Sequence, residues 1–216
     1  KAIVALFILC IGFSVLESET RAESASPQVS AKSFIIIDAV SGRTLCGENF
    51  EDKRAMASTT KIMTSIIALE KGNLKSQVKV SPRAASVGGS SFNLSIGERL
   101  SLENMLYGLL LPSGNDAAIA IAEHIGSTEE NFVHMMNEKA VELGALNTHF
   151  ANPHGLDNPQ HYSTAKDLAL ITRHALKNEK FREIIGTRTK KIDGGNYNKQ
   201  VTNTNRLLWE SENVHG

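Results

Sequence analysis

The order of hydrophobic patterns along the chain constrains its fold more than any other feature. Residues 33–38 are rich in β-branched side chains, and residues 43–46 can return beside them after a short turn. Residues 187–192 and 198–204 predict a second hairpin near the other end. The segments between the two hairpins have helical periodicity. Strands, then helices, then strands predict an α+β domain whose antiparallel sheet is built from both ends of the chain.

The helical middle begins with an apolar stripe over residues 62–69, which follows Ser58 and stops at Gly72. Its apolar side chains recur three and four residues apart, as on one face of an α-helix. Further helices are predicted over residues 101–110, 117–125, 127–144 and 164–176. Ser101 and Thr164 can cap two of them, and residues 127–130 form a capping box at the start of a third. Residues 78–101 show no long periodicity and predict a polar loop.

The N-terminal segment is typical of an export signal. Residues 2–16 are apolar and uncharged and follow Lys1. A membrane-spanning helix needs roughly 20 such residues, so this run is short for a span. We expect a signal peptide over residues 1–22 with cleavage after Ala22, and a linker over residues 23–32. A buried helix and an uncleaved anchor are the alternatives. Because the chain starts with Lys, we also expect that the first residues of the protein are missing.

Charge and cysteine content exclude several classes. The chain has 23 basic and 23 acidic residues, so it lacks the basic excess of a nucleic-acid-binding protein. Its two cysteines, Cys10 and Cys46, are too few for a cysteine zinc site. Removal of the signal peptide leaves Cys46 alone, which excludes an internal disulfide.

The first candidate for chemistry is a Ser-x-x-Lys pattern. Residues three apart share one face of a helix, so a lysine amine can reach the serine hydroxyl and remove its proton. This requires burial or a nearby cation to lower the lysine pKa. The pattern occurs at Ser58/Lys61, Ser76/Lys79 and Ser163/Lys166. We favour Ser58 and Lys61, because the apolar helix that follows should be buried at its start.

The second candidate is Ser-x-Asn in the turn between two predicted apolar helices. Ser113 and Asn115 lie there, preceded by Pro112. Such a turn can present a hydroxyl and a carboxamide to a cleft. The alternative is that Asn115 simply caps the following helix, since Asn is a favoured cap residue.

Taken together, the two patterns resemble the penicillin-recognising serine enzymes. The surrounding residues are similar to those of the D-alanyl-D-alanine carboxypeptidases, the low-molecular-mass penicillin-binding proteins. The matching blocks are residues 37–42, 57–64, 111–118, 152–157, 163–168 and 205–209. The resemblance covers residues 33–216 and implies a β-lactamase/transpeptidase-like fold, in which an antiparallel sheet packs against a helical subdomain.

The resemblance also implies roles for four side chains. Ser58 would be the acylated nucleophile and Lys61 its general base. Ser113 would relay a proton to the leaving amine, and Asn115 would bind the substrate amide and orient Lys61. The implied reaction removes the terminal D-alanine from peptidoglycan stem peptides, and penicillin would acylate the same serine. No cofactor and no metal ion are implied, including at His154 and His161.

The resemblance places the protein in the cell envelope. We expect an exported protein at the outer face of the cytoplasmic membrane, which acts in peptidoglycan biosynthesis and cell shape. A membrane anchor beyond this chain is compatible with the family. The family's Lys-Thr-Gly motif is absent from the 216 residues. We expect it, and the C-terminal strands that follow it, beyond Gly216, and we expect these residues alone to be inactive.

Two other functions stay open at this point. A serine β-lactamase would use a glutamate in Glu-x-x-Leu-Asn, but Leu143 stands where that glutamate would precede Leu146 and Asn147. A catalytically incomplete cell-wall-binding protein of the same fold is the other alternative. Intact Ser58, Lys61, Ser113 and Asn115 argue against it, whereas the absent Lys-Thr-Gly motif leaves it open.

Overall fold

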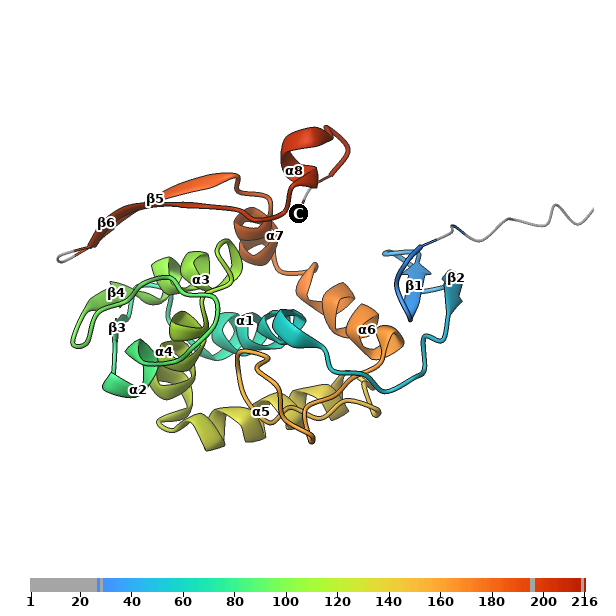
Figure 1. Cartoon of the computed structure of the whole chain (residues 1–216), viewed down its shortest axis with the longest axis horizontal. Helices are drawn as coiled ribbons and strands as arrows, with labels where there is room; N and C mark the ends of the chain where they lie inside the picture. The colour runs from blue at the N-terminus through green and yellow to red at the C-terminus, as the bar shows by residue number, and fades with distance from the viewer. Residues whose placement is uncertain (1–26, 28, 195–196, 215) are drawn as a thin grey trace, which may run out of the picture.

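A computed structural model describes residues 27, 29–194, 197–214 and 216 (Figure 1). Its elements in chain order are β1 (Phe34–Ile37), β2 (Thr44–Glu48), the 3-10 turn η1 (Ala57–Thr59), α1 (Thr60–Lys71), β3 (Gln77–Lys79), α2 (Pro82–Ala85), β4 (Arg99–Ser101), α3 (Leu102–Leu110), α4 (Asn115–Gly126), α5 (Glu129–Glu142), α6 (Ala165–Ala175), α7 (Glu179–Ile185), β5 (Thr189–Gly194), β6 (Tyr197–Thr202) and α8 (Leu207–Glu210).

The predicted signal peptide, residues 1–22, lies outside the described residues, as does part of the predicted linker. Within the described ranges, no helix has the length and apolar character needed to cross a membrane.

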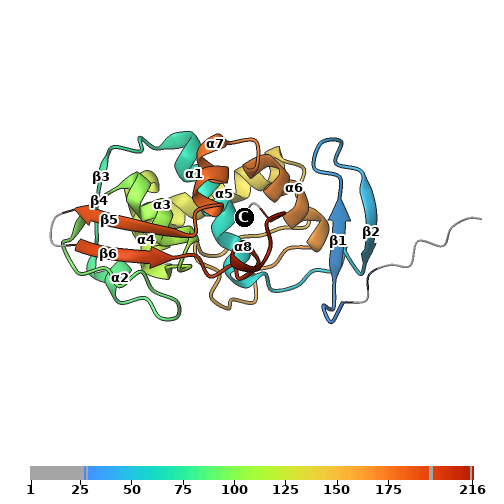
Figure 2. The ribbon, with the colours of Figure 1, turned by 90° about the horizontal axis from the view of Figure 1, so that it is seen from above.

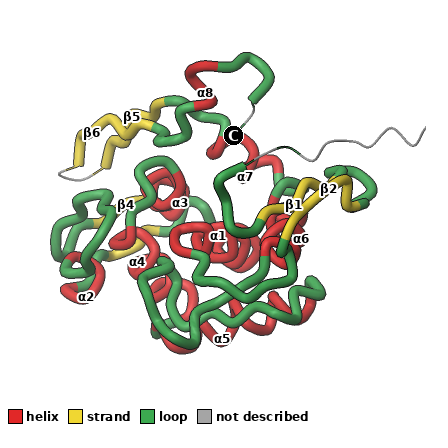
Figure 3. Tube along the Cα trace, turned by 45° about the vertical axis from the view of Figure 1, so that its right-hand side comes forward, coloured by secondary structure: helices red, strands yellow, loops and turns green. Residues whose placement is uncertain are grey.

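Helix α1 is the centre of the molecule and packs against α3, α4, α5, α6 and α7. In Figure 3 it lies in the middle of the helical body. The predicted apolar stripe is confirmed, since Met63, Ile66 and Ile67 are buried. The polar side chains at the start of α1 are buried as well, Lys61 and Thr64 among them. Because buried polar groups need partners, the surface around this end of α1 must supply hydrogen bonds.

Side-chain caps fix the starts of three helices, at Ser101 and Thr164 as predicted and at Thr128 within the predicted capping box of residues 127–130. The hydroxyl of Ser101 accepts the N–H of Asn104 at the start of α3. Thr128 caps α5 by accepting the N–H of Asn131, and Thr164 caps α6 by accepting the N–H of Asp167. Each cap satisfies a main-chain donor that has no partner inside its helix.

The prediction of one sheet built from both chain ends is wrong for the described strands. They form three separate antiparallel pairs, β1–β2, β3–β4 and β5–β6. Figure 2 shows β1–β2 and β5–β6 at opposite ends of the helical body. The β5–β6 hairpin covers α3 instead, with Ile192 and Val201 buried and Lys190 4.6 Å from the ring centre of Tyr107. The β1–β2 hairpin packs on α6.

The remaining differences concern short elements. Strands β3 and β4 lie in the stretch predicted as a loop and pair Gln77 with Ser101. Three-residue strands and helices of one or two turns, such as α2 and α7, carry too few residues to show a period. The mixed α+β class with antiparallel strand pairs agrees with the prediction.

Candidate active site

Ser58 and Lys61 lie together at the start of α1. Ser58 is exposed on η1, whereas the Lys61 side chain in the first turn of α1 is only 2% exposed. The Nζ atom of Lys61 lies 3.0 Å from the Oγ atom of Ser58. The spacing of three residues along a continuous helical path produces this contact, as expected from helix geometry. An exposed hydroxyl therefore has a buried amine as its direct neighbour.

The turn that presents Ser58 is held in an unusual conformation. Ala57 has a φ of +46°, in the left-handed region that non-glycine residues rarely adopt. The hydroxyl of Thr60 donates to the carbonyl oxygen of Ala57 at 2.7 Å, and Nε2 of His161 lies 2.7 Å from the same hydroxyl. Such strain persists only where the surroundings enforce it, and it is common at functional sites.

Two further oxygen atoms surround the Lys61 amine. Oδ1 of Asn115 and the main-chain carbonyl oxygen of His154 each lie 2.7 Å from Nζ. Burial lowers the pKa of Lys61 from 10.5 to about 8, while the charge of Asp116 acts in the opposite direction. A neutral amine has two N–H donors and one lone pair. When Lys61 is neutral and its two donors contact Asn115 and His154, its lone pair would face Ser58 Oγ, as a general base requires.

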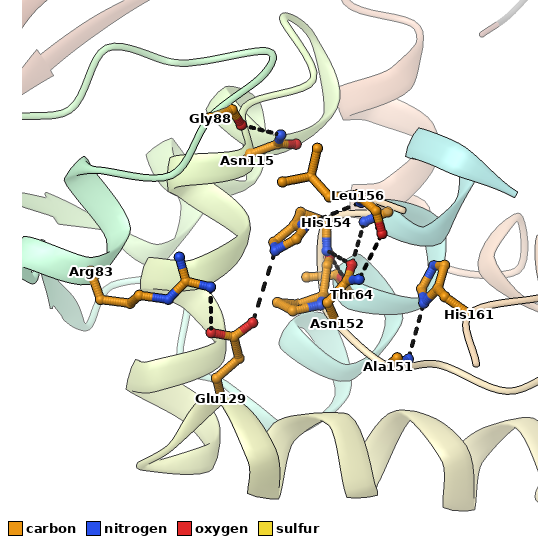
Figure 4. Close-up of polar contacts among 12 residues, drawn as sticks. Thr64, Arg83, Gly88, Asn115, Glu129, Ala151, Asn152, His154, Leu156 and His161 are labelled. Atoms are coloured by element: carbon orange, nitrogen blue, oxygen red, sulfur yellow. Dashed lines mark hydrogen bonds and ion pairs between the residues drawn. The ribbon is translucent and has the colours of Figure 1, made fainter. Parts of the chain in front are cut away.

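Asn115 joins the second motif to the first. Its Nδ2 atom donates to the carbonyl oxygen of Gly88 at 2.7 Å (Figure 4). This contact directs Oδ1 to Lys61. The alternative that Asn115 caps α4 is wrong. Gly114 occupies the cap position, and no side chain caps this helix.

Ser113 lies in the same turn, two residues before Asn115, with a φ of +61°. It is half-buried. Within the described residues its hydroxyl makes no hydrogen bond, so it is available to a bound molecule. The catalytic roles given to Ser58, Lys61, Ser113 and Asn115 stay predictions, because these contacts do not test them.

The other two Ser-x-x-Lys copies lack this arrangement. Ser76 bonds to the carbonyl oxygen of Asn73, and Lys79 lies exposed on strand β3 rather than on a helix. Ser163 is buried against Thr148, and exposed Lys166 pairs with Glu51. Neither lysine contacts its serine.

Asp116 was missed by the sequence reasoning. Its buried carboxylate accepts the N–H groups of Phe92 and Leu94 at 2.8 and 3.1 Å, and the hydroxyl of Ser91 at 2.7 Å. It thereby fastens the segment that includes Gly88 to the start of α4. The only sequence signal was an acidic residue in the first turn of a helix, which is common and unspecific.

His154 and His161 line the other side of the site. Burial is the main cause that lowers the pKa of each from 6.5 to about 4, so both rings are neutral near pH 7. The carbonyl oxygen of His154, rather than its ring, contacts Lys61, which no residue pattern could predict. In the described part of the chain, His, Cys, Asp and Glu side chains form no group of three or more that could hold a metal ion.

A cavity of about 320 Å³ opens beside the Ser58 turn. It is lined by Ala55, Ala57, Gly155, Leu156, Asp157, Asn158, Pro159 and His161. Ala57, which precedes Ser58 in the chain, lines this cavity, and the cavity is large enough for part of a ligand.

An exposed serine lies beside a buried lysine amine, an Asn contacts that amine, and a second serine lies in the turn that carries the Asn. This arrangement is suited to acyl transfer. The sequence profile of the D-alanyl-D-alanine carboxypeptidases, peptidase family S11, matches residues 19–216. The chain belongs to this family. It is a family of serine peptidases, as the resemblance implied.

Individual members of the family are similar over most of the chain. D-alanyl-D-alanine carboxypeptidase DacF of Bacillus subtilis is 38% identical over 212 residues, which cover 95% of this chain and 54% of the relative. DacC of Escherichia coli is 37% identical over 204 residues, covering 88% of this chain and 50% of the relative. The chain thus spans about half the length of the curated relatives it matches.

Solved structures of the family share the fold. A D-alanyl-D-alanine carboxypeptidase from Mycobacterium tuberculosis H37Rv superposes with a TM-score of 0.82 at 32% identity, covering 86% of this chain and 71% of that chain. A mutant of the Streptomyces K15 DD-transpeptidase gives a TM-score of 0.83 at 32% identity, covering 87% and 79%. The β-lactamase/transpeptidase-like fold implied by the resemblance is confirmed at the level of these neighbours.

Proposed function

We propose that the protein is a serine-type D-Ala-D-Ala carboxypeptidase, which removes the terminal D-alanine of peptidoglycan stem peptides through an acyl-enzyme on Ser58. The observation that carries the proposal is the contact of 3.0 Å between Ser58 Oγ and the buried amine of Lys61. Membership in the D-alanyl-D-alanine carboxypeptidase family supports the reaction type and the substrate class.

Acylation begins with proton transfer from Ser58 to Lys61. The neutral amine accepts the hydroxyl proton as Oγ attacks the carbonyl carbon between the two D-alanines. A charged ammonium has no lone pair and cannot do this, so a pKa of about 8 leaves a useful neutral fraction near pH 7. Asn115 and the His154 carbonyl keep the amine from turning away.

Breakdown of the tetrahedral intermediate needs a proton on the leaving amine. Ser113 is suited to pass it from Lys61, because its hydroxyl lies in the turn that carries Asn115 and makes no hydrogen bond within the described residues. The C–N bond then breaks, free D-alanine leaves, and the ester on Ser58 remains.

Deacylation returns the enzyme to its starting state. Lys61, neutral again after proton transfer, removes a proton from water as the water attacks the ester carbonyl. The C–O bond to Ser58 breaks and Ser58 recovers its proton. Penicillin would enter the same path through its strained amide and stall as the ester. Because peptidoglycan lies outside the cytoplasmic membrane, the proposal includes export of the protein to that side.

The test is release of D-alanine from a synthetic peptide that ends in D-Ala-D-Ala, with the full-length protein. We expect release by wild type and none by Ser58→Ala. Ser76→Ala is the matched control, because Ser76 heads another Ser-x-x-Lys pattern and should retain full activity. Peptide binding without release would favour the cell-wall-binding alternative. Rapid hydrolysis of penicillin without peptide cleavage would favour a β-lactamase.

A further inference from the structure

The imidazole ring of His154 is a buried group that the mechanism above does not use. His154 is 4% exposed, and its Nε2 atom is a buried side-chain atom without a hydrogen-bond partner among the described residues. Only its main-chain carbonyl contacts Lys61. An unpaired buried polar atom is costly, so the position of this ring calls for an explanation.

The Nδ1 atom of His154 closes the loop that carries this carbonyl. It accepts the N–H of Leu156 at 3.1 Å. Asn152 braces the same loop from its other end, since Oδ1 accepts the N–H of Gly155 at 2.7 Å and Nδ2 donates to the carbonyl oxygen of Leu156 at 2.9 Å (Figure 4). Asn152 therefore holds the N–H of the His154–Gly155 peptide group, and the His154 ring holds the next N–H along the chain. Together they fix the direction in which the His154 carbonyl oxygen points.

Two side chains of helix α1 contact the loop that His154 and Asn152 brace. Thr64 donates to the carbonyl oxygen of Pro153 at 2.6 Å, and Lys61 contacts the carbonyl oxygen of His154 at 2.7 Å. Two consecutive carbonyl groups of the loop thus meet side chains one turn apart on α1. A rotation of the loop would move both.

The opposite edge of the ring faces a charged pair. Oε1 of Glu129 lies 3.9 Å from His154 Nε2, and Oε2 of Glu129 lies 3.3 Å from a guanidinium nitrogen of Arg83. Burial, and the positive charges of Lys61 and Arg83, disfavour a charged ring. A carboxylate beside Nε2 and an N–H donor beside Nδ1 both favour the neutral tautomer that has its proton on Nε2.

We propose that His154 is a positioning residue for Lys61: as the neutral Nε2–H tautomer it accepts the Leu156 N–H through Nδ1 and so aims its own carbonyl oxygen at the lysine amine. The catalytic consequence rests on the proposed function. The carbonyl holds one of the two N–H donors of neutral Lys61, and its loss would let the lone pair turn away from Ser58. Misalignment of this kind slows the chemical step more than it weakens binding.

Two substitutions distinguish the role of Nδ1 from the role of Nε2 in His154. In His154→Asn, the amide oxygen can occupy the place of Nδ1 and accept the Leu156 N–H. In His154→Gln, the longer amide reaches the place of Nε2 beside Glu129 but leaves no acceptor at Nδ1. His134→Asn is the control, because His134 lies exposed on α5.

The experiment measures the first-order acylation rate and the non-covalent binding constant of a chromogenic β-lactam with the full-length protein. We expect His154→Asn to acylate within about threefold of wild type and His154→Gln to be slower by about tenfold or more, with binding unchanged. Equal rates for the two variants, or a defect in binding alone, would overturn the proposal.

A second measurement does not depend on activity. Nitrogen NMR of the wild-type protein labelled with ¹⁵N-histidine reports the tautomer of His154, assigned by its loss in His154→Asn. We expect the proton on Nε2. A proton on Nδ1 would overturn the proposal even if His154→Gln fails to fold. If wild type is not acylated, the proposed function fails, whereas the tautomer still decides whether His154 braces the loop.

Discussion

The Nζ atom of Lys61 and the Oδ1 atom of Asn115 lie 2.7 Å apart, although the two residues are separated by 54 positions in the sequence. Asn115 is fixed at its other end by the carbonyl oxygen of Gly88, so its amide has one orientation. The contact unites a motif at the start of α1 with a motif at the start of α4. It also defines how the lysine amine is presented to Ser58.

Replacement of Lys61 tests its role as a base. Arginine stays charged at any accessible pH and cannot accept the Ser58 proton. We expect Lys61→Arg to slow acylation by about 10²–10⁴, the usual contribution of a general base. Lys61→Met should behave alike, which controls for the larger size of arginine. Stopped-flow acylation measures the rate, and circular dichroism checks the fold. Acylation of Lys61→Met at the wild-type rate is incompatible with the mechanism.

The pH dependence of acylation should follow the lysine. Since the neutral amine is the active form and burial lowers its pKa to about 8, the rate should rise with pH and level off above this value. A rate profile between pH 6 and 10 checks this. A profile that is flat between pH 7 and 9 would contradict the assignment of Lys61 as the base.

Replacement of Asp116 tests the same assignment independently, because it should shift the pH–rate profile of acylation. Its negative charge favours the charged form of Lys61. Asp116→Asn should therefore lower the Lys61 pKa and move the midpoint of the rate profile to lower pH. The variant should also lose about 1–3 kcal/mol of stability, because an amide cannot accept all the hydrogen bonds of the carboxylate. Asp52→Asn, at an exposed carboxylate, is the control and should move neither value.

Sequence patterns predicted the parts of the site that depend on local spacing. The Ser58–Lys61 contact follows from three-residue spacing on a helix, and the caps at Ser101, Thr128 and Thr164 follow from their residue types. These features depend on neighbours along the chain, so local propensity was enough to predict them.

Long-range features were beyond such reasoning. The carboxylate of Asp116 binds main-chain groups of a segment more than 20 residues away, and the His154 carbonyl reaches Lys61 across 93 positions. Every residue has a main-chain carbonyl group, so the residue types do not indicate which carbonyl will contact Lys61. Strand pairing between distant segments is a second long-range feature. The two end hairpins were expected to share a sheet, whereas β5–β6 packs on α3.

Gly155 tests whether the loop holds the Ser58 turn in place. It has a φ of +93°, and a Cβ atom there would lie 1.9 Å from the carbonyl oxygen of Ala57. Gly155→Ala should push the Ala57–Ser58 turn aside and slow acylation by about tenfold or more. Gly144→Ala is the matched control, with a φ of +78° but open space around it. It should cost only about 1 kcal/mol of stability and leave acylation intact. Equal acylation rates in the two variants would refute this view of the turn.

The two buried histidines predict acid sensitivity. Their pKa falls from 6.5 to about 4 on folding, so the unfolded state binds more protons between these values. The free energy of unfolding should therefore decrease as pH falls from 6.5 to 4, by roughly 3 kcal/mol for each histidine. Urea denaturation at several pH values measures this. In His154→Asn the decrease should be smaller, and an unchanged decrease would show that His154 does not contribute.

Covalent labelling tests the central claim most directly. The full-length protein is treated with penicillin, digested and analysed by tandem mass spectrometry. The account predicts one penicilloyl ester, located on Ser58 and absent from Ser58→Ala. An adduct on Ser76, Ser113 or Ser163 in wild type, with Ser58 unmodified, would contradict it.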